Sequence, residues 1–150
     1  MLGLPKGQVK LVPTHPHWKQ SFLEESKKLK SILGNHIEGI EHIGSTAINE
    51  IESKPIVDIL IGVKSLADAS QFDFDELKKE DYYRLKASVK DKVVLAKFSD
   101  LTNHVKTHIL HVVEINGDWW NQHLFFRDYL NTNPDVAAEY AKLKAELAIK

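Results

Sequence analysis

An almost unbroken apolar run at residues 56–63 constrains most strongly what this chain can fold into. The run reads Ile-Val-Asp-Ile-Leu-Ile-Gly-Val, and its content of Ile and Val is typical of a strand buried on both faces. Its only charged residue is Asp58, and an ionised carboxylate in such a strand is costly unless it has a partner. Because side chains alternate along a strand, Asp58 shares a face with Leu60 and Gly62. Asp58 is therefore either a structural residue, paired with Lys54 or a backbone amide, or a carboxylate that opens onto a cleft.

A turn of small residues, Gly44-Ser45-Thr46, precedes this strand in the sequence. Glycine permits a positive φ and a close approach of the backbone, and free amides beside two hydroxyls can form a concave nest for phosphate oxygens. The alternative is an ordinary turn in which Ser45 or Thr46 caps a helix. Twelve residues separate Ser45 from Asp58. We expect the turn and the acid to face one another across a solvent-exposed, anion-binding hollow.

Several short segments carry a further signal. They are Val12-Pro13, Trp18, His42-Ile43-Gly44-Ser45-Thr46, Lys54-Pro55-Ile56-Val57-Asp58-Ile59, His108-Ile109-Leu110-His111-Val112 and Phe125-Phe126-Arg127-Asp128-Tyr129-Leu130. Taken together, these segments resemble the GrpB family, whose members are small proteins assigned to the nucleotidyltransferase superfamily with its polymerase-beta-like fold. The similarity covers nearly the whole chain, and the combination of segments is more specific than any one of them.

The resemblance implies metal-dependent transfer of a nucleotidyl group to an acceptor that short motifs do not identify. In that interpretation Asp58 is the catalytic residue and its carboxylate binds Mg²⁺ or Mn²⁺. The phosphates are bound by the turn together with Lys54 and Arg127. The turn residues are Gly44, Ser45 and Thr46. Nucleotidyltransferases usually carry a second acid two positions after the first, and here that position is Leu60. The resemblance therefore supports the fold more strongly than it supports catalysis.

Two further metal ligands are predicted in the segment at residues 108–115. His108 and His111 are three positions apart, which places them on opposite faces of a strand. His111 is either a hydrogen-bonded core histidine or a residue of the cleft that contacts metal or phosphate. Glu114 is the best candidate for a second carboxylate near Asp58 if the two strands are neighbours, and otherwise it is an exposed glutamate at a strand end.

Arg127 lies between aromatic residues and Asp128. A guanidinium there can bind a phosphate or carboxylate in a bidentate manner, or it can form a structural ion pair with Asp128 or a glutamate of the last helix. The neighbouring aromatic residues are more typical of a core than of a surface on which bases stack; they are Trp119, Trp120, Phe125 and Phe126.

The remaining patterns predict an α+β fold with a mixed sheet of about four or five strands and packed helices. The resemblance implies a nucleotidyltransferase-like strand order, which the patterns alone do not fix. A helix is expected from Pro16 to Gly34, with a polar loop at residues 101–107. Asp118 is expected to cap a helix, and the apolar stripe of the last helix is Val136, Tyr140, Leu143 and Leu147. Strands are predicted at residues 37–43, 56–63, 82–89, 93–99 and 108–115.

Composition excludes several classes of protein. A chain of 150 residues with 43% hydrophobic and 27% charged residues predicts a single domain over residues 1–150. A formal net charge of −1 gives no strong signal for nucleic acid, and no apolar stretch is long enough for a membrane span. The absence of cysteine excludes disulfides and thiolate metal sites. With no signal-peptide pattern, we expect a cytoplasmic protein.

Three functions remain open from the sequence. The first is a nucleotidyltransferase. The second is a non-catalytic module that binds a nucleotide or another phosphorylated small molecule. The third is an accessory interaction domain without a small ligand, which a solvent-closed turn at Gly44 to Thr46 would favour.

Overall fold

The computed structural model describes residues 2–5, 10–86 and 89–149. In these residues it contains five strands and four α-helices, with short 3₁₀ turns between them. None of the helices in these residues has the length and apolar character that crossing a membrane requires. In chain order the main elements are α1 (His17–Leu33), β1 (Gly39–Ile43), β2 (Val57–Val63), α2 (Phe74–Lys79), β3 (Tyr82–Arg84), β4 (Val93–Asp100), β5 (Val105–Glu114), α3 (Asp118–Thr132) and α4 (Pro134–Ile149).

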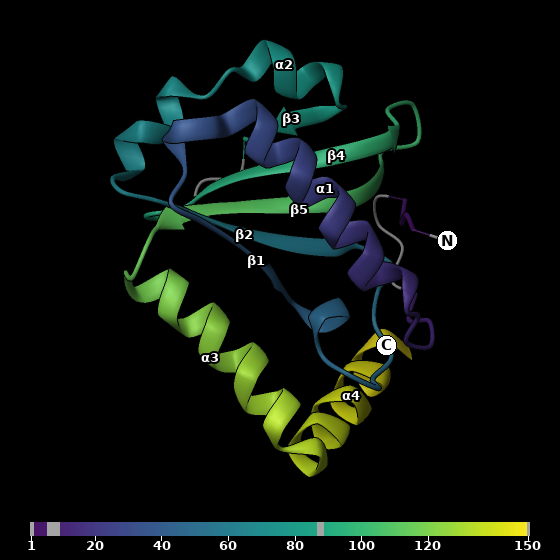
Figure 1. Cartoon of the computed structure of the whole chain (residues 1–150). Coiled ribbons are helices and arrows are strands. Elements are labelled where there is room, and N and C mark those ends of the chain that lie inside the picture. The colour runs from purple at the N-terminus through teal and green to yellow at the C-terminus, as the bar shows by residue number, and fades with distance from the viewer. Residues whose placement is uncertain (1, 6–9, 87–88, 150) are drawn as a thin grey trace.

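The strands form one mixed sheet in the order β1-β2-β5-β4-β3 (Figure 1). β2 and β5 are parallel, and the other neighbours are antiparallel. The apolar run becomes β2, with β1 on one side and β5 on the other, as its hydrophobic character on both faces predicts. The predicted α+β fold with a mixed sheet is confirmed.

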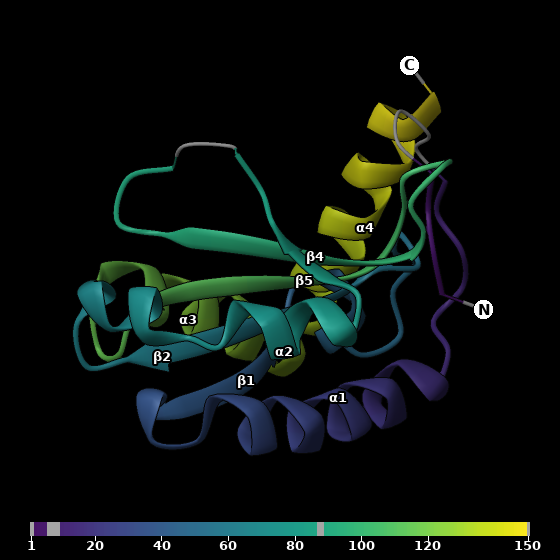
Figure 2. The ribbon, with the colours of Figure 1, turned by 90° about the horizontal axis from the view of Figure 1, so that it is seen from above.

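Each face of the sheet has its own hydrophobic core. α1 covers one face, where Leu29 and Leu33 belong to the same buried cluster as Val57 and Ile59 of β2, and α4 lies on the opposite side of the sheet (Figure 2). On the second face Trp120 of α3 packs with three buried residues of the strands, Ile43, Leu60 and Val113. Asp58 belongs to the second face because it is one position from Val57 and two from Leu60.

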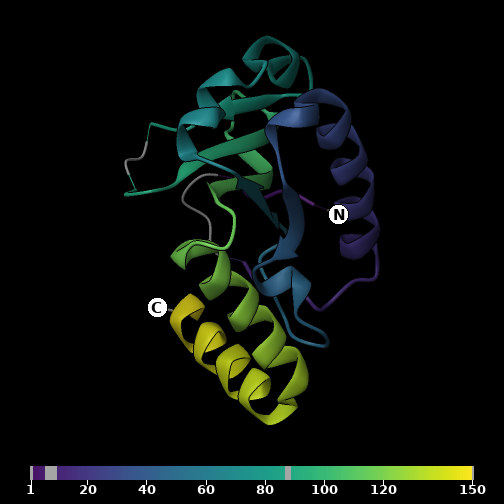
Figure 3. The ribbon, with the colours of Figure 1, turned by 60° about the vertical axis from the view of Figure 1, so that its left-hand side comes forward.

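α3 and α4 lie side by side as a helical hairpin (Figure 3). Leu130 of α3 and Ala137 of α4 are buried against Ile48 and Ile51, which lie in the segment after the Gly-Ser-Thr turn. This packing fixes the hairpin beside the turn. The predicted apolar stripe of α4 is only partly right, because Leu143 and Leu147 are 54% and 61% exposed.

Most local predictions hold, and three are corrected. The first helix ends at Leu33 with Gly34 after it, as predicted. Gly117 rather than Asp118 is the N-cap of α3, so Asp118 is the first helical residue and makes no cap. The expected loop at residues 101–107 is shorter, since β5 begins at Val105. The strand predicted at 82–89 ends at Arg84, and its positions 87–88 lie outside the described residues.

Candidate functional site

Gly44 and Asp58 are in direct contact at the end of the β1–β2 pair. Ile43 is the register partner of Asp58, so Gly44 follows at the position where β1 ends. Gly44 has φ 74° and ψ −174°, a conformation that is essentially restricted to glycine. A Cβ on Gly44 would lie 2.5 Å from Asp58 Oδ2. The turn and the acid lie close together as expected, but they are in direct contact rather than on two sides of a hollow. The Asp58 side chain is 28% exposed and is not sealed beneath apolar residues.

The second oxygen of Asp58 is bound by His111. His111 Nε2 lies 3.0 Å from Asp58 Oδ1, and the His111 side chain is 18% exposed. β2 and β5 are parallel with Leu60 paired to His111, so Asp58 and His111 share one face of the sheet. With Asp58 ionised, Nε2 carries the proton and donates to the carboxylate, which leaves Nδ1 as an acceptor. His108 lies on the other face beneath α1, where its Nε2 is 2.9 Å from Ser21 Oγ.

Lys92 extends this chain of contacts beyond His111. Its Nζ lies 3.3 Å from His111 Nδ1 and 2.9 Å from His123 Nε2. The same ammonium lies 3.9 Å from the centroid of a Trp119 ring, which is a cation–π distance. Burial and the charge of Lys92 lower the pKa of His123 to about 4, so at neutral pH its Nε2 accepts a hydrogen bond from Lys92. Burial also lowers the pKa of Lys92, while attraction to Asp58 opposes that shift.

The hydroxyl of Ser45 faces α4. Lys144 donates a hydrogen bond from Nζ to Ser45 Oγ, and Tyr140 OH lies 3.4 Å from the same oxygen. Burial and the nearby charge of Lys54 lower the pKa of Lys144, and Asp58 again opposes the shift. Lys54 itself is exposed. Ser45 Oγ is therefore in contact with the ammonium group of Lys144.

Thr46 has a more structural environment than Ser45. It is 3% exposed, and its Oγ1 lies 2.8 Å from His42 Nε2. Burial lowers the pKa of His42 to about 4, and its ring stacks on Phe22 of α1 at 4.9 Å between centroids. Thr46 thus helps to fix the turn on α1. Ser45 is itself only 9% exposed, so most of the turn is closed to solvent, which is the observation that favours the accessory interaction domain.

Arg127 is occupied by protein acceptors. It donates to Glu41 at 2.7 Å, to Asp128 at 2.8 Å and to the carbonyl of His42 at 3.1 Å. The ion pair with Asp128 was one of the predicted alternatives, and the second carboxylate comes from β1 rather than from the last helix. Two carboxylates balance the guanidinium charge, so Arg127 joins α3 to β1 beside the site. Its predicted contact with phosphate stays a prediction.

The placement of Glu114 near Asp58 is wrong. The strands are neighbours, but the register partner of Asp58 is Ile109 and that of Glu114 is Val63. Five positions along a strand correspond to roughly 16 Å, and an odd separation also places Glu114 on the other face. Glu114 Oε2 instead accepts from the amide of Leu66 at 3.2 Å. It is the strand-end glutamate of the alternative interpretation.

The donor set around Asp58 does not fit a two-metal centre. Such centres need several oxygen ligands around the ions. Leu60, which stands where a second acid is usual, is fully buried against Trp120. In the described part of the chain no three His, Cys, Asp or Glu side chains are grouped so that they could hold a metal ion. Asp58 is thus a single carboxylate with imidazole and lysine neighbours.

A cavity of about 910 Å³ lies next to the Gly-Ser-Thr turn, and Thr46 forms part of its lining. The lining also includes Lys19 at the start of α1, residues 48–52 and four alanines of α4, namely Ala137, Ala138, Ala141 and Ala145. Asp58 and His111 are not part of the lining. The cavity is therefore a neighbouring space, and Asp58 itself lies at the partly exposed surface of the second face.

Comparison with known proteins shows which family has this arrangement. The profile described as "GrpB protein" matches residues 8–150. The chain belongs to the GrpB family. Its residues are 52% identical to the glutamate-rich protein GrpB of Alkalihalophilus pseudofirmus over 100% of this chain and 87% of that protein. The UPF0157 protein YqkA of Bacillus subtilis is 38% identical over 96% of this chain, which spans only 41% of that longer protein.

Two solved structures and one further relative extend the comparison. The GrpB protein of Enterococcus faecalis aligns with a TM-score of 0.82 at 29% identity, over 93% of this chain and 82% of that one. The Cid1 poly(U) polymerase aligns with a TM-score of 0.51 at 16% identity, over 79% of this chain and 38% of that one, which shows similarity of fold alone. The dephospho-CoA kinase of Mycolicibacterium paratuberculosis is 26% identical over 94% of this GrpB-family chain and 40% of its own length.

The sequence missed Lys92, His123 and Lys144. None of the three belongs to a motif that predicts a site. Lys92 reaches the site from the residue before β4, His123 from α3 and Lys144 from α4. Only the strand register and the helical hairpin bring them to Asp58 and Ser45.

Proposed function

We propose that this protein binds the phosphate groups of a nucleotide, or of another phosphorylated small molecule, at Ser45 beside Asp58. The observation that carries the proposal is the contact between Gly44 and Asp58, which leaves no room for a Cβ. The backbone of Gly44 lies against the Asp58 carboxylate, and Lys144 binds the hydroxyl of the next residue, Ser45. We call this group, which combines an acid and a cation, the polar corner.

The cations at this corner favour an anionic ligand. Lys144 contacts Ser45, Lys54 is close enough to lower the pKa of Lys144, and Lys92 lies beyond His111. Asp58 is the only carboxylate that these contacts include. An ammonium group donates up to three hydrogen bonds, and a phosphate oxygen is a strong charged acceptor. The excess of lysine over carboxylate therefore supports an anion as the ligand.

Nucleotidyl transfer to an unidentified acceptor is the second candidate function. The fold similarity to a poly(U) polymerase and the Gly-Ser turn followed by Asp58 favour it. Magnesium or manganese stays the predicted cofactor of that reaction. The single carboxylate and the buried Leu60 weigh against it, so binding is the better supported of the two functions.

A thermal-shift screen tests the first proposal. The full chain is heated with ATP, GTP, CTP, UTP, coenzyme A or dephospho-CoA, each with EDTA, with Mg²⁺ or with Mn²⁺. A ligand at about 100-fold over its dissociation constant stabilises a protein by about 3 kcal/mol, or roughly 6–12 °C for a chain of this size. Ser45→Ala should weaken the effect of the ligand, and Ser31→Ala, at an exposed position on α1, should not.

The screen, combined with an assay of label transfer, separates the three functions. Transfer of label from an α-³²P nucleotide, abolished by Asp58→Asn, would support the transferase. Stabilisation by a nucleotide without transfer would support the binding module. If none of the six compounds shifts the melting temperature under any of the three metal conditions, the phosphate site is refuted and the accessory domain becomes the better interpretation.

A further inference from the structure

Lys92 has a setting that differs from that of an ordinary surface lysine. It is half-buried, its ammonium lies over a Trp119 ring, and it donates to two imidazoles. Among the residues that the structure describes, no carboxylate lies within 4.0 Å of its Nζ as an ion-pair partner. Protein side chains therefore hold the position of Lys92 but do not neutralise its charge.

The acid nearest to Lys92 is reached through one imidazole. Lys92 donates to His111 Nδ1, and His111 Nε2 donates to Asp58 Oδ1. The other carboxylate oxygen, Oδ2, faces Gly44, which precedes Ser45 and its contact with Lys144. The order across the site is thus Lys144, Ser45, Asp58, His111 and Lys92, with a cation at each end and the acid in the middle.

This order resembles the charge distribution that a divalent ion would otherwise provide. A bound metal attaches to a carboxylate and presents positive charge to phosphate oxygens. Here the lone carboxylate has one oxygen engaged by His111, and lysines lie on both sides of it. A divalent ion added at Asp58 would be repelled by both lysines, because like charges in a partly dehydrated site are weakly screened.

We propose that this site binds a polyphosphate chain without a divalent metal ion, with Lys92 and Lys144 as the cations that contact it. The inference rests on the proposed function, which it narrows to a ligand with at least two linked phosphates. One phosphate would contact Lys144 and Ser45, and another would contact Lys92. His111 acts here as a positioning residue that links Lys92 to Asp58.

Titration of the full chain in excess EDTA tests this inference. Inorganic tripolyphosphate and ATP are added, and binding is followed by calorimetry. We expect saturable binding in EDTA that is not strengthened by Mg²⁺, because Mg²⁺ complexes the free polyphosphate. Lys92→Met should weaken binding of both probes by about 10-fold, since a hydrogen bond to a charged group contributes on the order of 1.5 kcal/mol.

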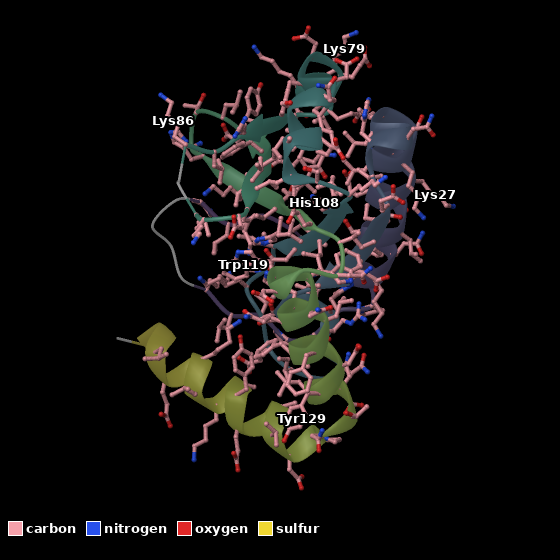
Figure 4. The ribbon with its side chains drawn as sticks, turned by 90° about the vertical axis from the view of Figure 1, so that its left-hand side faces the viewer. Lys27, Lys79, Lys86, His108, Trp119 and Tyr129 are labelled. Carbon is pink, nitrogen blue, oxygen red and sulfur yellow. The ribbon has the colours of Figure 1, made fainter. Side chains whose placement is uncertain are left out.

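Three variants serve as controls for folding and for charge. Lys92→Arg keeps the charge and should bind within a few-fold of the parent chain. Lys92→Gln removes the charge but keeps a donor, so it serves if Lys92→Met does not fold. Lys27→Met removes the same charge from the exposed face of α1, while Trp119 lies at the start of α3 away from that helix (Figure 4). This variant should leave binding unchanged.

The outcomes separate the two proposals. Binding of ATP that appears only with Mg²⁺ would overturn metal-free binding and leave the nucleotide site intact. Binding in EDTA that Lys92→Met and Lys92→Gln leave unchanged would overturn the role of Lys92. Absence of binding by either probe, with metal and without it, would refute the proposed function itself.

Discussion

Replacing Gly44 with alanine tests the geometry on which the site depends. At φ 74° and ψ −174° any residue other than glycine is strained by roughly 1–3 kcal/mol. The added Cβ would also lie 2.5 Å from Asp58 Oδ2 and 3.0 Å from Asp58 Cβ, so the acid must move. Moving it stretches the hydrogen bond from His111, which contributes about 1 kcal/mol at this partly exposed position. We expect a total loss of about 3 kcal/mol, or roughly 6–12 °C in melting temperature.

Gly34→Ala is the matched control, because Gly34 also has a positive φ, 51°, but nothing lies within 4 Å of its added Cβ. Urea unfolding, followed by tryptophan fluorescence, should show a smaller loss for Gly34→Ala than for Gly44→Ala. A double-mutant cycle with Asp58→Ala then isolates the contact, and we expect a coupling of at least about 1 kcal/mol. Equal losses at the two glycines, together with additive effects at residues 44 and 58, would refute a direct contact between turn and acid.

Three further predictions concern buried groups. Leu60→Asp, which restores the missing acid, should lower the free energy of unfolding in urea by about 3 kcal/mol or more, because Leu60 is fully buried. The control Leu101→Asp should have little effect, because Leu101 is 52% exposed. Burial lowers the pKa of His108 from 6.5 to about 4, so between these pH values the folded state binds fewer protons than the unfolded state. The free energy of unfolding should therefore fall as the pH decreases from 6.5 to 4. In His108→Gln this decrease should be smaller by up to about 3 kcal/mol. Glu25→Gln should lower the free energy of unfolding at pH 7 by roughly 3 kcal/mol, since Glu25 is 5% exposed and Lys97, 2.7 Å away, loses its ion-pair partner. An unchanged urea midpoint would contradict this prediction.

The sequence was sufficient for the parts of the site that local rules determine. Strand alternation assigns Asp58 to one face of a buried strand, and a Gly-Ser turn one strand earlier has little freedom once the two strands pair. A neighbouring pair of antiparallel strands then brings Gly44 to Asp58, as the register of Ile43 with Asp58 shows. The positions of Gly44 and Asp58 could therefore be predicted from the hydrophobic pattern and the chemistry of the turn.

The parts that failed depend on register and on helix placement. Glu114 was predicted near Asp58 from the adjacency of two strands, but adjacency without register leaves the position along the strand undetermined. Lys92, by contrast, reaches the site through a register that no pattern reveals, since Val94 pairs with His111 and Lys92 lies two residues earlier, immediately before β4. Lys144 depends on how α4 folds back over the turn. Contacts of this kind are tertiary and leave no short motif.

The absence of a second acid at Leu60 is connected to the packing of Trp120. A Cβ on Gly62 would lie 2.8 Å from Trp120 Cζ3, and one on Gly39 would lie 2.9 Å from its Cη2. Gly39 and Gly62 are register partners on β1 and β2, so the indole rests on a pair of glycines directly beside buried Leu60. Trp120 thus covers the sheet at the position where a second carboxylate would have to reach a metal ion. A single substitution at residue 60 would leave that carboxylate beneath an indole. Restoring the second acid alone would therefore not build a metal site in this chain.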